Sequence, residues 1–135
     1  MNKKLKVAFL GGGINSAVGR THRIAIEMDR RYELVAGCFS RNDETNVITA
    51  KEYEVDLNRC YKNLDELIKN EKNNIDAICI LTPTPNHKEE VINCIKNGIK
   101  VICEKALAVS VKEALEIKEA LEKYKGFLVV TYNYT

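Results

Sequence analysis

The chain has 135 residues, of which 45% are hydrophobic and 30% charged, and its 21 basic and 19 acidic residues leave a net charge of +2. That length suits one soluble domain with its own core. Because the positive and negative charges nearly balance, there is no reason to expect nucleic acid or an acidic membrane surface as a partner. Because the sequence lacks both an apolar run of about 20 residues and a signal-peptide pattern, we expect a cytoplasmic protein with no membrane contact.

The first predicted strand, residues 6–10, leads into a glycine-rich turn that holds Gly11, Gly13, Ile14, Asn15 and Ser16. Glycines let backbone amides approach a pyrophosphate, and the positive end of a following helix favours the anion. In the G-x-G-x-x-G spacing, Ser16 takes the third position, which requires a small residue. Two interpretations stay open here: a dinucleotide site, or a tight turn without a ligand.

A helix pattern begins after this turn. Its apolar stripe predicts the face that packs on the sheet, and consists of Ala17, Val18, Thr21, Ile24, Ala25 and Met28.

The second predicted strand, residues 33–39, ends before Ser40, Arg41 and Asn42. An Asp or Glu about 20 residues past the glycines would bind the ribose of NAD, and none stands at these three positions. Ser40 and Arg41 can instead hold the 2′-phosphate of NADP, which gives NADP a slight preference over NAD. Two alternatives are a shifted register that brings Asp43 or Glu44 to NAD, and Arg41 as a solvated turn residue.

Weaker signals follow the second strand. Residues 43–53 predict a weak helix, and residues 56–61 a short strand or a loop. Asn63 with Glu66 resembles a capping box at the start of another helix.

The third predicted strand, residues 77–81, is followed by Thr82, Pro83 and a second proline, which fix an extended turn. Asn86 with Glu89 resembles a capping box, so a helix is expected from Asn86 or His87. Asn86 is either an N-cap or a site residue. His87, as a single histidine, is a weak catalytic signal, and the alternative is a residue of the first helical turn that packs on the loop.

The fourth predicted strand, residues 101–103, ends before Glu104 and Lys105. This pair is either a surface ion pair of little worth or, given its place at a strand end, functional. A further helix is expected to begin at Ser110, with Glu113 completing its capping box. Gly98 and Gly126 stand where helix C-caps belong, and a fifth strand is predicted over residues 127–131.

Cysteine and histidine numbers indicate no metal site. The five cysteines are odd in number and show no C-x-x-C pair, so buried reduced thiols are expected. Two histidines are too few for a His-based cluster.

Strands that alternate with helices predict a single α/β domain: a Rossmann-type, doubly wound parallel sheet in three layers. Ligands of such sheets bind at the carboxyl ends of the strands, so the residues just after each strand are the candidate site.

Together these strand-end residues resemble the N-terminal cofactor domain of the Gfo/Idh/MocA oxidoreductases. The resemblance covers essentially all 135 residues. The matching motifs are Gly11-Gly12-Gly13-x-x-Ser16-x-x-Gly19-x-x-His22-Arg23, Thr82-Pro83-x-x-x-His87, Glu104-Lys105 and Asn133-Tyr134.

The resemblance implies a role for each motif. Gly11, Gly13 and Ser16 would line the pyrophosphate, Ser40 and Arg41 would lie by the adenosine ribose, and Thr82, Pro83, Asn86 and His87 would border the dinucleotide. Glu104 and Lys105 match a Glu-Lys-Pro motif whose lysine lies beside nicotinamide and substrate, with a catalytic or orienting part, although Ala106 replaces the proline. Asn133 would approach the nicotinamide, and His22 and Arg23 are interpreted as packing or surface residues.

The resemblance also implies that the family's C-terminal substrate and oligomerisation domain is absent. The implied function is NAD(P)-dependent hydride transfer on a sugar, polyol or related substrate, with little turnover by this chain alone and a small-molecule substrate bound only with a second domain. An apolar sheet edge or face left uncovered would favour a homo-oligomer. The alternative is a non-catalytic dinucleotide-sensing module.

Overall fold

Five parallel strands form one sheet in the order β2-β1-β3-β4-β5 in the computed structural model, which describes residues 3–132. The predicted strands are confirmed, and their ends lie within one residue of those expected. Their bounds are β1 (Leu5–Gly11), β2 (Tyr32–Cys38), β3 (Ala77–Leu81), β4 (Lys100–Glu104) and β5 (Leu128–Thr131).

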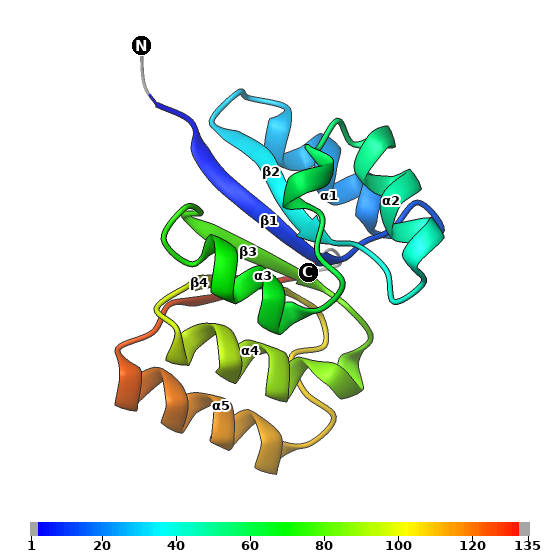
Figure 1. Cartoon of the computed structure of the whole chain (residues 1–135). Coiled ribbons are helices and arrows are strands. Elements are labelled where there is room, and N and C mark those ends of the chain that lie inside the picture. Colours follow the sequence, from blue (N-terminus) through cyan, green and yellow to red (C-terminus); the bar gives the residue numbers. More distant parts are fainter. Residues whose placement is uncertain (1–2, 133–135) are drawn as a thin grey trace.

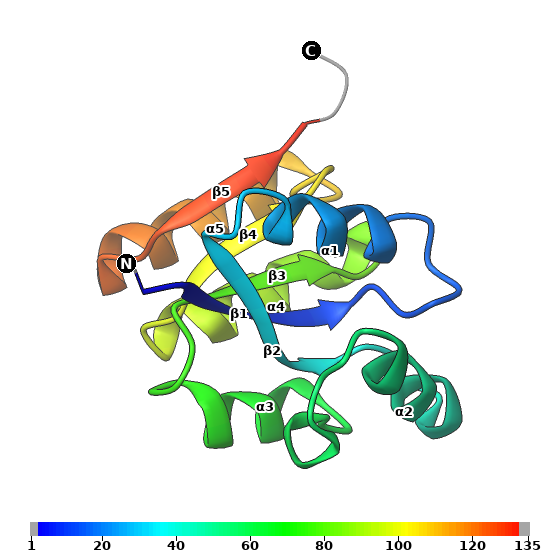
Figure 2. The same ribbon diagram turned by 90° about the horizontal axis from the view of Figure 1, so that it is seen from above.

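Helices cover both faces of this sheet, as Figures 1 and 2 show. Side chains from α3, α4 and α5 build the core on one face, and α1 and α2 contribute to the core on the other. The three-layer Rossmann-type architecture is therefore confirmed. The bounds are α1 (Gly19–Glu27), α2 (Asp43–Glu52), α3 (Leu64–Glu71), α4 (His87–Lys96) and α5 (Val111–Tyr124), with short 3-10 turns η1 (Leu57–Arg59) and η2 (Thr84–Asn86).

The prediction of which face of α1 packs on the sheet is wrong. Ile24 and Met28 are 55% and 76% exposed, and the helix begins at Gly19 instead of Ala17. The sheet side of α1 instead holds partly buried His22, Arg23 and Ile26. The polar side chains lie inward because His22 pairs with Glu104 and Arg23 lies over the ring of Tyr53. The periodicity of apolar residues along a helix carries no information about such pairs.

Two of the three predicted capping boxes are confirmed at their N-caps. Asn63 accepts a hydrogen bond from the Glu66 N–H (2.9 Å), and Ser110 accepts one from the Glu113 N–H (3.2 Å). Asn86 makes no such bond, so its predicted cap is wrong. The turn η2 precedes α4 directly and leaves Asn86 with helical dihedral angles (φ −90°, ψ −15°), which do not suit an N-cap.

Three further predictions concern residues 56–61 and the glycines expected at two helix ends, Gly98 and Gly126. Residues 57–59 form η1, and Cys60 makes a single parallel bridge to Gly37. Gly98 has a positive φ of 76° before β4, as a C-cap glycine should. At the end of α5 the left-handed residue is Lys125, not Gly126, whose missing side chain makes room for Ile95.

Four cysteines are buried and Cys60 is partly buried, all as free thiols. Burial raises the pKa of Cys79, Cys94 and Cys103 to about 12, so these thiols stay protonated and unreactive. Between residues 3 and 132, no group of three or more His, Cys, Asp or Glu side chains is placed to hold a metal ion. No helix in this range is long and apolar enough to cross a membrane.

A buried carboxylate joins η1 to α3. Glu71, whose side chain is 4% exposed, accepts two hydrogen bonds from the Arg59 guanidinium and one from the Tyr61 hydroxyl (2.7 Å). Burial raises the pKa of Glu71, but the hydrogen bonds from Arg59 and Tyr61 and the Arg59 charge outweigh this effect and leave the pKa below its ordinary 4.5. The ionised form is therefore stabilised by folding.

We expect Glu71→Gln to lower the free energy of unfolding by about 1–2 kcal/mol at neutral pH, because Arg59 loses its counter-charge. A folded pKa below the unfolded one contributes stability above the unfolded value, which is lost as the pH falls through the folded value. The deficit relative to the unmodified chain should therefore shrink below about pH 4.5. Urea unfolding across this range measures it, with exposed Glu119→Gln as control. A deficit independent of pH would contradict this explanation.

Candidate functional site

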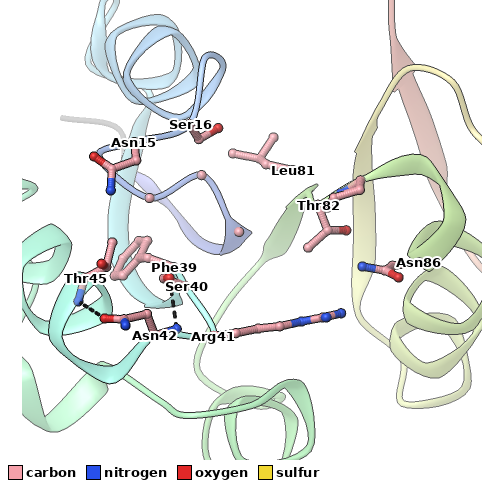
Figure 3. Close-up of a pocket in the computed structure, with 14 residues that line it drawn as sticks. Asn15, Ser16, Phe39, Ser40, Arg41, Asn42, Thr45, Leu81, Thr82 and Asn86 are labelled. Atoms are coloured by element: carbon pink, nitrogen blue, oxygen red, sulfur yellow. Dashed lines mark hydrogen bonds between the residues drawn. The ribbon is translucent and has the colours of Figure 1, made fainter.

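A cavity of about 720 Å³ opens where β1, β2 and β3 end. This volume is typical of a small-molecule or cofactor site. Three segments line it: the glycine turn after β1, the loop after β2, and the turn after β3 (Figure 3). Nine predicted cofactor residues are brought together here, namely Gly11, Gly13, Asn15, Ser16, Ser40, Arg41, Thr82, Pro83 and Asn86.

The glycine turn has a backbone conformation that residues with a Cβ could adopt only with strain. Gly11 and Gly12 have positive φ angles of 80° and 75°. A Cβ at Gly11 would lie 3.1 Å from the Thr82 backbone, and one at Gly13 would lie 3.0 Å from the Phe39 carbonyl oxygen. The turn thus runs close to the ends of both neighbouring strands and presents backbone to the cavity.

The close approach of helix and turn occurs at Gly19, not at Ser16. A Cβ at Gly19 would lie 2.0 Å from the Gly12 carbonyl oxygen. Ser16 lies in the turn before α1, where its N–H donates to the Gly13 carbonyl (2.8 Å) and its side chain faces the cavity. Residues 14–18 lengthen the turn, so the packing role of the third glycine moves three residues along the chain.

Two side chains, one from α2 and one from the residue that follows it, hold the turn in place. Tyr53, which follows α2, donates from its hydroxyl to the Gly12 carbonyl (2.9 Å), and Thr49 accepts from the Ile14 N–H (3.1 Å). Burial raises the pKa of Tyr53, so the hydroxyl stays a donor. Sequence reasoning missed both residues, although their spacing of four on a predicted helix was the available signal.

We expect Tyr53→Phe to weaken cofactor binding a few-fold and to cost about 1 kcal/mol of stability, because the Gly12 carbonyl loses a buried donor. Calorimetric titration and thermal unfolding measure the two effects. Tyr124→Phe, at the end of α5, is the control. Equal behaviour of the two variants would show that the hydroxyl does not support the turn.

The loop after β2 presents Ser40, Arg41 and Asn42 to the cavity, and α2 adds Thr45. Asn42 accepts from the Thr45 N–H (2.9 Å) and caps α2. Figure 3 shows the Arg41 side chain extended from the end of β2 toward Asn86. Asp43 and Glu44 lie in the first turn of α2, outside the residues that line the cavity.

A smaller hollow of about 230 Å³ adjoins the cavity and shares Gly11, Ser40, Arg41 and Thr82 with it. It also contains Lys62 and Glu90. Burial raises the pKa of Glu90, and the hydrogen bond that its carboxylate accepts from the Thr82 hydroxyl (2.6 Å) opposes that rise. This hollow is therefore lined by two cations, Arg41 and Lys62, and by the Glu90 carboxylate, which is hydrogen-bonded to Thr82.

Five predicted residues are not among those that line the cavity. Ile14 contributes its N–H to Thr49, Lys105 is exposed beyond β4, and His87 is fully buried. Glu104 is 8% exposed, and Asn133 lies outside the described residues.

Glu104 connects α1 to the turn that carries Lys105. One of its carboxylate oxygens lies 2.9 Å from Nε2 of His22, and the other accepts from the Lys105 N–H (2.9 Å). Burial raises the pKa of Glu104, but the bonds from His22 and Lys105 outweigh it and lower the pKa overall. His22 is thus a packing residue, as expected. The Lys105–Ala106 peptide bond is cis, where the related motif carries proline.

Comparison with known proteins places the chain among oxidoreductases. Residues 5–132 match the GFO_IDH_MocA family model, described as an oxidoreductase family with an NAD-binding Rossmann fold. The chain is 34% identical over its whole length to the oxidoreductase YfiI of Bacillus subtilis, and 26% identical over 96% of its length to glucose-6-phosphate 3-dehydrogenase of that species. It also superposes on an inositol dehydrogenase homolog from Azotobacter vinelandii, solved with NAD⁺ (TM-score 0.92, 30% identity, 99% of this chain).

These proteins are longer than the chain. It spans 35% of YfiI, 34% of the glucose-6-phosphate enzyme and 35% of the Azotobacter protein. The matched part is in each case about a third of the whole.

Proposed function

Because the chain belongs to the Gfo/Idh/MocA oxidoreductase family and forms its NAD-binding Rossmann domain, we propose that it holds the dinucleotide for a dehydrogenase. The observation that carries this proposal is the cavity at the ends of β1, β2 and β3, with the glycine turn along one wall. A Cβ at Gly11 or Gly13 would press on neighbouring backbone, so this wall is bare peptide. A pyrophosphate is recognised by backbone N–H groups of this kind.

Each segment has a part in the proposed binding. The turn around Gly13 and Ser16 faces the pyrophosphate, Ser40 and Arg41 take the adenosine ribose, and Thr82, Pro83 and Asn86 form the opposite wall. When bound, the dinucleotide supplies the hydride chemistry, and the residues of this chain bind and orient it.

For the finer choice of cofactor we propose NADP over NAD. Ser40 and Arg41 stand where an acidic residue would bind the ribose of NAD, and Lys62 adds a second cation in the adjoining hollow. Among the cavity-lining residues that the structure describes, none is acidic. A guanidinium with a neighbouring ammonium suits a 2′-phosphate.

Lys105 is the proposed catalytic or orienting group. It follows β4 at the same edge of the sheet as the cavity, and Glu104 holds its backbone N–H. We propose that it acts beside the nicotinamide and an alcohol or carbonyl substrate, such as a sugar or polyol, in the whole enzyme. Relatives that act on glucose-6-phosphate and inositol support this substrate class.

The isolated chain is proposed to bind cofactor with little or no turnover, because the remainder of such an enzyme would complete the substrate pocket. Ile24, Met28, Phe127 and Val129 are between 44% and 76% exposed, and β5 is an edge strand. Such apolar surface would also favour self-association.

Calorimetric titration of the 135-residue chain with NAD(H) and NADP(H) tests the proposal. We expect one site per chain and tighter binding of NADP(H). No binding of any of the four forms would contradict a dinucleotide function for this chain. Tighter binding of NAD(H) would leave the function intact and overturn the cofactor preference.

A further inference from the structure

We propose that His87 is a positioning residue, whose ring joins the turn that carries Lys105 to the turn after β3. The inference rests on the proposed function only where its test uses NADH. The side chain of His87 is not among those that line the cavity.

The ring of His87 lies between two backbone carbonyls. His87 is the first residue of α4 and has no exposed surface. Its Nδ1 lies 2.7 Å from the Ala106 oxygen, and its Nε2 lies 2.7 Å from the Thr82 oxygen. Ala106 follows Lys105, and Thr82 lines the cavity, so a single ring spans the distance between the proposed reactive turn and the cofactor wall.

Both partners of the ring are acceptors only. A carbonyl oxygen has no hydrogen to give, so each contact is a hydrogen bond only when the ring nitrogen carries hydrogen. A neutral ring would place one bare nitrogen against an oxygen at 2.7 Å in a buried site, where an unmade bond is costly. The geometry therefore requires hydrogen on both nitrogens, which makes the ring an imidazolium cation.

The charged groups near the ring suit a cation. On α4, the carboxylate of Glu90 interacts electrostatically with His87. In the turn after β4, Glu104 and Lys105 precede the bonded Ala106. Between β3 and α4 the chain contributes no charged residue, only Thr82, Pro83 and the residues of η2 (Thr84–Asn86). Glu90 is thus the counter-charge of the ring.

Lys105 is consequently held on both sides through its backbone. Glu104 accepts from the Lys105 N–H, and His87 donates to the carbonyl of the next residue, Ala106. The side chain of Lys105 is exposed while its backbone is tied to two helices, since His22 of α1 holds Glu104 and His87 belongs to α4. This arrangement would aim the ammonium without contacting it.

Two amide variants separate the two bonds. In His87→Asn the side-chain nitrogen takes the place of Nδ1 and keeps the bond to Ala106, whereas in His87→Gln it takes the place of Nε2 and keeps the bond to Thr82. We expect His87→Gln to shift the Leu107 amide resonance, which belongs to the Ala106–Leu107 peptide group, and His87→Asn to restore it. NADH affinity should fall about tenfold in His87→Gln only, while ADP-ribose, which lacks the nicotinamide, binds both variants equally.

Nitrogen NMR of the unmodified chain tests the ring directly, even if a variant does not fold. We expect both His87 nitrogens to carry hydrogen. One bare nitrogen, or equal effects of the two variants on Leu107 and on NADH, would overturn the proposal. If the unmodified chain binds neither NADH nor ADP-ribose, the proposed function fails, and the ring and amide spectra still decide the role of His87.

Discussion

Gly19→Ala is expected to destabilise the chain by about 3 kcal/mol and to abolish dinucleotide binding. The new Cβ would lie 2.0 Å from the Gly12 carbonyl oxygen, 2.5 Å from the Gly12 carbonyl carbon and 2.8 Å from the Tyr53 hydroxyl. Backbone atoms cannot move aside as a flexible side chain can, so α1 and the glycine turn must separate. Urea unfolding measures the stability, and calorimetry measures the binding.

Gly98→Ala is the matched control for this variant. Gly98, unlike Gly19, has a positive φ, of 76°, but a Cβ there would meet no atom within 4 Å. We expect backbone strain of about 1 kcal/mol and unchanged cofactor binding. If the two variants lose the same stability and both still bind, the close contact at Gly19 is not what shapes the site.

Arg41→Ala is expected to lower the affinity for NADPH by about 10- to 100-fold and to leave the affinity for NADH nearly unchanged. A hydrogen bond to a charged group contributes about 1.5–3 kcal/mol, and each 1.4 kcal/mol is a factor of ten. Arg41 extends across the cavity and lies with Lys62 around the adjoining hollow, where a 2′-phosphate would need its charge (Figure 3). Titration of both cofactors into both proteins gives the selectivity directly.

Arg31→Ala makes the same change of charge away from the cavity, since Arg31 precedes β2 and pairs with Asp29 at the surface. We expect it to change neither affinity beyond a weak, salt-dependent effect. Equal losses of NADH and NADPH affinity in Arg41→Ala would mean that Arg41 holds a part common to both cofactors.

The strands and the residues next to them could be predicted from the sequence alone. Runs such as residues 77–81 are short, apolar and buried on both sheet faces, and this local property is visible in the chain itself. Because parallel strands end at one edge, the residues after three of them had to meet, and nine of the expected cofactor residues do line one cavity.

The inner face of α1, by contrast, could not be predicted from the sequence. Its apolar residues Ile24 and Met28 point outward, and His22 and Arg23 lie inward because of distant partners. His22 pairs with Glu104, which is 82 residues away in the chain, and Arg23 lies over the ring of Tyr53 (5.6 Å). Helical periodicity assumes an apolar inner face, and buried polar pairs break that assumption.

The local sequence thus determined the elements, their order and the chemistry at the strand ends, because burial and turn formation act over a few neighbouring residues. Tertiary structure decided which groups support the site. Gly19 meets Gly12, Tyr53 reaches the Gly12 carbonyl 41 residues away, and His87 lies between carbonyls of two different turns. Such contacts form only when the crossovers bring separate segments to one edge of the sheet, so a local pattern in the chain does not show which residues meet there.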